Sequence, residues 1–203
     1  MLITLEILAL VIAPLIFLYL KGTWHLRASI PCLVSISILW YLTYSPIHEL
    51  SYAAATYLVG GQVTYMKLIP RFWLGEYGRA WITPAGITEG WQQLIMTASP
   101  YIMDVACLTA VIFVLQRGFS KKDFVVGLVF MLLCLRPAFD FICETIAFLS
   151  GDRGDFFHIE ILTGSFMIRL LLLLSLGLSL FAIVNILRRF VGFPDAPLRT
   201  AST

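Results

Sequence analysis

The chain has 203 residues, of which 60% are hydrophobic and only 13% are charged, and its formal net charge is +2. A composition this apolar excludes an ordinary soluble domain. The small net charge, without a basic stripe interleaved with aromatic residues, argues against nucleic acid as a partner. We therefore expect an integral membrane protein surrounded by membrane lipid.

Five apolar runs have about the length that a membrane span needs, roughly 20 residues of helix. They cover residues 2–20, 30–59, 91–115, 124–149 and 167–187. The sequence therefore predicts an all-α polytopic membrane protein with about five transmembrane helices. These helices form a single transmembrane domain over residues 1–190, and residues 191–203 form a polar C-terminal tail.

A different pattern occupies residues 62–69 and 79–83, which are rich in β-branched and aromatic side chains and are separated by glycines. This pattern predicts a small membrane-associated β-hairpin. One interpretation is an interfacial loop with aromatic anchors. The other is an edge strand that pairs with an extended substrate. In the second case the substrate-binding residues are Val63, Tyr65 and Lys67.

The Lys and Arg residues of the connecting segments predict the orientation, because cytoplasmic loops carry an excess of them. With five spans, one side carries Lys21, Arg27, Arg117, Lys121, Lys122, Arg188, Arg189 and Arg199. The other side carries Lys67, Arg71, Arg79 and Arg153, with Arg169 at its margin. We therefore expect a cytoplasmic C-terminus in the cell membrane, with the hairpin on the opposite side.

His48 and Glu49 lie inside the second apolar run. A charged side chain at the centre of a membrane helix costs roughly 2.5–3.5 kcal/mol, so such a residue is a candidate for function. The pair begins the motif H-E-x-x-H, in which two histidines bind zinc and the glutamate is the general base. The last position of the motif is Tyr52 here. A neutral phenol is a poor zinc ligand unless the metal removes its proton.

The surrounding pattern extends from residue 46 to residue 104. After His48 and Glu49 come a helix of small residues, a glycine pair, the hairpin, and Ala98-Ser99-Pro100 followed by Asp104. This order resembles the site-2 protease family of intramembrane zinc metalloproteases. That family has H-E-x-x-H, a glycine pair, a membrane-embedded β-loop and a small-Gly-Pro segment ending in Asn. The chain departs from the family at Tyr52, at Ser99 and at Asp104.

A later Asp, often beside a Gly, supplies the third zinc ligand in the family, and Gly154-Asp155 matches it. The resemblance implies zinc held by His48, by Asp155 and by either Tyr52 or His158. It implies Glu49 as the catalytic base, and a transmembrane protein or membrane-proximal peptide as substrate.

Other interpretations of the same residues stay open. The chain is then a catalytically inactive relative, a pseudoprotease that binds transmembrane partners, in which Tyr52 hydrogen-bonds a neighbour and no metal is held. Asp155 is either a zinc ligand or a residue of a hydrated loop, and the sequence favours the two interpretations equally. A transporter is a more distant alternative, motivated by the acidic residues of the fourth run.

Arg136, Asp140 and Glu144 follow one another at intervals of four residues in the fourth run. Residues four apart share one face of a helix. We expect a structural ion ladder within this helix, in which opposite charges offset the cost of burial. The alternative is a pair of acids that line a polar cavity.

Overall fold

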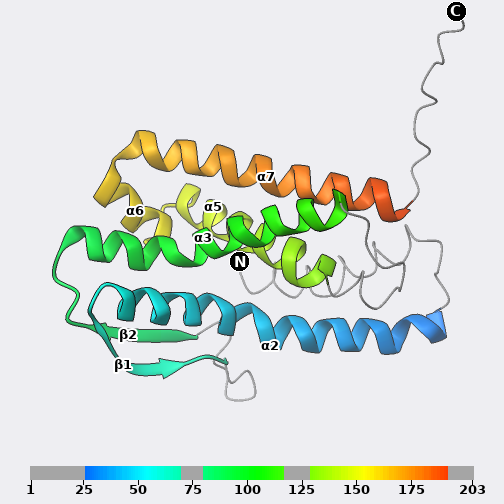
Figure 1. Ribbon diagram of the computed structural model, residues 1–203, viewed down its shortest axis with the longest axis horizontal. Coiled ribbons are helices and arrows are strands. Elements are labelled where there is room, and N and C mark those ends of the chain that lie inside the picture. Colours follow the sequence, from blue (N-terminus) through cyan, green and yellow to red (C-terminus); the bar gives the residue numbers. More distant parts are fainter. Residues whose placement is uncertain (1–25, 70–79, 117–128, 192–203) are drawn as a thin grey trace, which may run out of the picture.

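The computed structural model describes residues 26–69, 80–116 and 129–191 (Figure 1). The elements, in chain order, are α2 (Leu26–Leu58), β1 (Gln62–Lys67), β2 (Trp81–Ala85), α3 (Gly90–Gln116), the π-helix η2 (Phe130–Leu135), α5 (Arg136–Leu149), α6 (Asp155–Thr163) and α7 (Ser165–Val191). The expected class, helical with one small β-hairpin, is confirmed. The expected first span and tail lie outside the described residues.

Helix α3 is the centre of the bundle, because it packs against α2, η2, α5, α6 and α7. Figure 1 shows α2, α3 and α7 along the long axis of the molecule, with α3 and α7 running in the same direction and α2 opposite to them. The main core joins α3, η2, α5, α6 and α7. Its buried members include Tyr101, Leu108, Phe141, Phe156 and Ile168.

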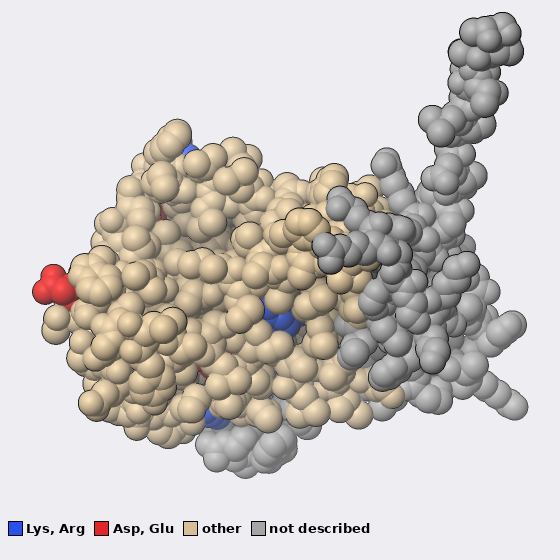
Figure 2. All heavy atoms as spheres, viewed as in Figure 1, with Lys and Arg blue, Asp and Glu red and all other residues tan. Residues whose placement is uncertain are grey.

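Two of the described helices are long and apolar enough to cross a membrane, fewer than the five expected. They are Gly90–Val114 and Ser165–Asn185. Their outer faces are apolar, as Phe113 in α3 and Leu173 in α7 illustrate with exposed fractions of 57% and 72%. In Figure 2 the described residues on the visible face show only isolated Lys, Arg, Asp or Glu side chains. A surface of this kind fits lipid better than water.

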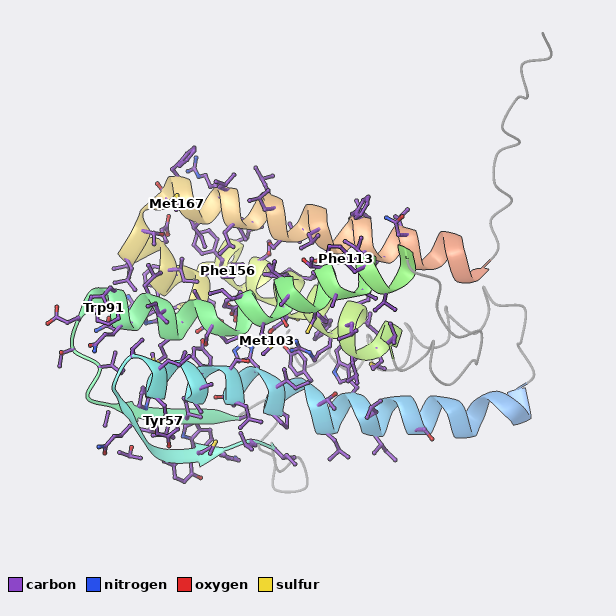
Figure 3. The ribbon with its side chains drawn as sticks, viewed as in Figure 1. Tyr57, Trp91, Met103, Phe113, Phe156 and Met167 are labelled. Atoms are coloured by element: carbon purple, nitrogen blue, oxygen red, sulfur yellow. The ribbon has the colours of Figure 1, made fainter. Side chains whose placement is uncertain are left out.

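Exposed apolar side chains continue along the full length of α3. Figure 3 places Trp91 near the start of α3 and Phe113 near its far end, with Met103 between them. All three are exposed, whereas Phe156 of α6 is completely buried. The outer face of α3 therefore carries exposed apolar side chains from one end of the helix to the other.

Two glycines bring the hairpin back onto α2. Gly60 ends the helix with a φ of +85°, a conformation that side chains with a Cβ rarely adopt. A Cβ on Gly61 would lie 2.5 Å from the Cδ1 atom of Ile87 and 3.0 Å from the carbonyl oxygen of Ala85, so a larger residue would crowd the base of the hairpin. The expected glycine pair thus has a structural role at the base of the hairpin.

The hairpin is antiparallel, with Gln62 opposite Ala85 and Lys67 opposite Trp81, and its register shifts between Val63 and Tyr65. Both strands contact α2, and Figure 1 shows them lying beside the C-terminal half of this helix. The hairpin predicted from the sequence is confirmed.

The expected fourth span changes geometry in its middle. A π-helical turn, Phe130–Leu135, precedes α5, and the N–H of Arg136 bonds to the carbonyl of Met131, five residues earlier. Pro137 follows at the start of α5 and lacks an N–H donor, which explains why the regular helical ladder is interrupted here. The π-helical turn directly precedes Arg136, whose side chain is buried inside the bundle.

Candidate functional site

His48 is held by a carboxylate from another helix. Its Nδ1 atom lies 2.8 Å from Oδ2 of Asp140 in α5, and the hydroxyl of Tyr44 donates to Oδ1 of the same carboxylate at 3.3 Å. Tyr44, His48 and Tyr52 are spaced by four residues, so one face of α2 carries all three. Asp140 thereby orients the imidazole ring and leaves Nε2 facing away from α5.

The Nε2 atom of His48 faces Asp155, the first residue of α6, at 3.6 Å from Oδ2. The same carboxylate oxygen accepts a hydrogen bond of 2.8 Å from the hydroxyl of Tyr101 in α3. The phenol of Tyr52 also faces Asp155. The rings of Tyr52 and Tyr101 both meet the His48 ring edge-on, with centroids 5.1 and 5.9 Å away. The fold therefore gathers residues distant in sequence around Asp155.

A cavity of about 290 Å³ opens beside this cluster. It is lined by residues of α2, β2, α3 and α6. They are Glu49, Tyr52, Trp81, Ile82, Pro84, Met96, Thr97, Asp155 and His158. A cavity that combines apolar walls with several polar side chains is typical of a binding site.

Glu49 connects the cavity to the hairpin. Its side chain is buried, and its carboxyl faces the backbone of Ile82 in β2. Since β1 pairs with one edge of β2, this contact marks the other edge, which faces α2 and the cavity. Pro84, which has no N–H, tolerates such an edge position.

The hairpin residues that line the cavity come from β2, whereas Val63, Tyr65 and Lys67 lie on β1. Tyr65 stacks on Trp81 with ring centroids 5.7 Å apart, and Nζ of Lys67 lies 4.6 Å from the centre of the Trp81 ring. These two β1 side chains therefore contact a residue that lines the cavity, and β2 is the strand that a bound segment would meet.

The expected ladder inside the fourth run is replaced by pairs between helices. Arg136 binds Asp104 of α3, and both side chains are fully buried. Asp140 binds His48 of α2, and Glu144 faces the backbone of Phe156 at the start of α6. The spacing of four residues does put all three side chains on one side of the helix, but neighbouring helices supply their partners.

Two polar atoms of the buried pair have no hydrogen-bond partner among the described residues, namely Asp104 Oδ2 and Arg136 Nε. Asp140 lies beside Asp104, so the two pairs form one polar chain through the bundle. This chain runs from Arg136 through Asp104 and Asp140 to His48.

The residues implied as zinc ligands fit a zinc ion only in part. His48 Nε2 and Asp155 Oδ2 are 3.6 Å apart, a separation that two ligands of one ion can have when each lies about 2 Å from it. The carboxylate of Asp140 on Nδ1 is the usual partner of a metal-binding histidine. No group of three His, Cys, Asp or Glu side chains in the described part of the chain converges on a metal position. A catalytic zinc takes three protein ligands, so this set is one short.

His158 lies one turn after Asp155 and lines the same cavity. Its Nδ1 atom is 2.9 Å from the carbonyl oxygen of Gly154, and its side chain is exposed. The backbone contact leaves Nε2 available to the cavity, on the side of α6 that carries Asp155.

Sequence reasoning missed Tyr101 and assigned Asp140 to the wrong partner. The spacing of Tyr44, His48 and Tyr52 was a usable signal, because three polar rings on one helix face predict a polar partner opposite. Nothing in the sequence indicated which helix supplies that partner.

No family model matches the chain, and no match was found among curated proteins or solved structures.

Proposed function

We propose that this protein is an integral membrane protein, similar to site-2 proteases, that binds an extended segment of a membrane-inserted partner in the cavity beside β2. Two apolar helices of membrane-spanning length support the membrane location. We extend the assignment to five spans in the cell membrane, with the C-terminus in the cytoplasm, on the strength of the apolar runs and the basic residues.

The edge of β2 at the cavity, with which no described strand pairs, carries this proposal. The carboxyl of Glu49 faces the backbone of Ile82 at that edge, where an extended peptide would form its own main-chain hydrogen bonds. Addition of a strand to an exposed edge is a common way to bind peptides, with pockets selecting the alternate side chains. The apolar walls formed by Trp81 and Met96 suit a hydrophobic segment of this kind.

The contacts of Asp155 favour binding without turnover. In the resemblance Asp155 is a zinc ligand, but here it accepts a hydrogen bond from Tyr101 and faces the phenol of Tyr52. Tyr52 stands where the motif has its second histidine. The Tyr101 hydroxyl stabilises the partly exposed carboxylate and so takes over part of what a cation would supply. The protein is, on this proposal, a pseudoprotease.

Photo-crosslinking in nanodiscs tests the binding proposal. The benzophenone amino acid replaces Met96, which lines the cavity, or Met103, which is exposed on the same helix. The probe is an apolar hexapeptide, and the control is the same peptide with its backbone nitrogens methylated. We expect the unmodified peptide to crosslink at position 96 and the methylated peptide to lose that signal. Equal labelling from positions 96 and 103 would overturn the proposal.

A zinc metallopeptidase is the second candidate, and the 3.6 Å separation between His48 Nε2 and Asp155 Oδ2 favours it. His48 and Asp155 would hold the ion, and Tyr52 or His158 would be the third ligand. A zinc ion bound there would act as a Lewis acid. The zinc content of the purified protein, compared with that of His48→Ala, decides between the two candidates.

A further inference from the structure

Glu144 lies directly under the start of α6. Its carboxyl faces the backbone of Phe156, the second residue of that helix. A Cβ built on Gly154, the residue before α6, would lie only 2.8 Å from Oε2 of Glu144. Oε2 is buried and has no hydrogen-bond partner among the described residues.

Helix α6 has no cap of its own. The residue at the N-cap is Gly154, which has no side chain to accept a bond from the first free N–H groups of the helix. An acidic group near a helix N-terminus supplies that bond and also interacts favourably with the helix dipole. The carboxyl of Glu144, from another helix, lies beside Gly154, where the side chain of a serine or aspartate N-cap would usually be.

Attraction to Asp155 does not explain the location of Glu144, since both side chains are acids and like charges disfavour the contact. The backbone of α6 is the favourable partner. The close packing explains Gly154 as well, because its backbone angles, φ −80° and ψ −165°, are open to any residue. A Cβ at position 154 would press on the carboxyl of Glu144, so glycine suits this position by its size and not by its conformational freedom.

We propose that Glu144 is a positioning residue that fixes the start of α6 and thereby holds Asp155 against His48 and Tyr101. This inference rests on the proposed function only in that Asp155 belongs to the binding cavity. Asp155 lies between Gly154 and Phe156, the two residues that Glu144 contacts, so a shift of the helix start moves its carboxylate away from His48 Nε2.

Nitrogen NMR of the full-length protein with ¹⁵N-labelled histidine tests the inference without any peptide or metal. The chain has 3 histidines, and the His48→Gln variant assigns the His48 signals. We expect Glu144→Ala to shift the Nε2 signal of His48 while the Nδ1 signal, set by Asp140, stays close to its native position. Glu144→Gln keeps an acceptor oxygen and should preserve both signals.

Gly154→Ala provides the matched test of the contact. In the native background the added methyl meets Oε2 of Glu144, so the Nε2 signal of His48 should shift. In Glu144→Ala the obstacle is absent, so adding Gly154→Ala should cause little further change. Leu172→Ala, a core change in α7, controls for general destabilisation and should lower the melting temperature without a selective Nε2 shift.

Two results would overturn the inference. One is an unchanged Nε2 signal in Glu144→Ala protein that melts as the native protein does. The other is an effect of Gly154→Ala that is the same with and without Glu144. Either result leaves the peptide-crosslinking test of the cavity untouched, so failure of this inference and failure of the proposed function are distinguishable.

Discussion

The Arg136–Asp104 pair and the His48–Asp155 group lie on the same polar chain but satisfy their charges differently. Arg136 and Asp104 are buried at 1% and 0% exposure, and each has the opposite charge as its partner. The side chain of Asp155 is 26% exposed beside the cavity and accepts a hydrogen bond from the hydroxyl of Tyr101. The Arg136–Asp104 pair is closed to solvent and stabilises the fold, whereas the His48–Asp155 group places polar side chains beside the cavity. Charge inside an apolar bundle therefore need not indicate a site unless a cavity reaches it.

The largest expected effect comes from breaking the closed pair. Arg136→Ala leaves Asp104 as an uncompensated buried charge and should destabilise the protein by about 3–5 kcal/mol. Replacing both residues, Arg136→Met with Asp104→Leu, should cost much less, because no charge is then stranded. Thermal unfolding in detergent measures both. Equal melting temperatures for the single and double variants would contradict the buried pair.

The two carboxylates that face His48 should differ in their effect on stability. Asp140→Asn removes a charge-assisted bond at 2.8 Å from a side chain that is 4% exposed, and should cost about 1.5–3 kcal/mol. Asp155→Asn should cost less, because water can reach that side chain. Both changes conserve shape, so chemical denaturation compares them directly. A larger loss for Asp155→Asn would mean that the two regions have been assigned the wrong way round.

Tyr52→His should change metal binding more than stability. Two histidines four residues apart share a helix face, and His48 with Asp155 would then complete three ligands. We expect weak, substoichiometric zinc in the native protein and clearly tighter zinc in Tyr52→His, measured by elemental analysis after dialysis. Tyr52→Phe is the control and should gain none.

Native protein with one tightly held zinc that His158→Ala removes, and that Tyr52→Phe leaves in place, would refute the pseudoprotease assignment. If Tyr52→His gains no zinc, the site has lost more than one ligand.

The smallest expected effect is that of single cysteine substitutions, whose labelling tests which side of the membrane each region faces. Single cysteines at Thr200 and at Gly75, in a background without the native cysteines, should be labelled from the cytoplasmic and the opposite side respectively. Labelling of both from one side would refute the odd number of spans. Exchanged sides would keep the fold and reverse the orientation.

Much of the local structure followed from the sequence. The apolar runs predicted the long helices, and the two β-branched segments predicted β1 and β2. His48 and Asp155 were expected to meet only through the resemblance, since 106 residues separate them in the sequence, and the fold does bring them within 3.6 Å. The partners of Arg136 and Asp140 could not be predicted, because spacing within a helix does not show which neighbouring helix faces each side chain.

The sequence by itself determined the apolar composition, the helix and strand periodicities, and the substitution of Tyr52 in the zinc motif, because each depends on residues close together in the chain. Only the tertiary structure decided that β2 borders the cavity, that Arg136 pairs with Asp104, and that Glu144 lies against the start of α6. Those outcomes depend on how helices pack around α3. A buried charged side chain pairs with a residue of the helix that packs against it, and the sequence of one helix does not show which helix that is.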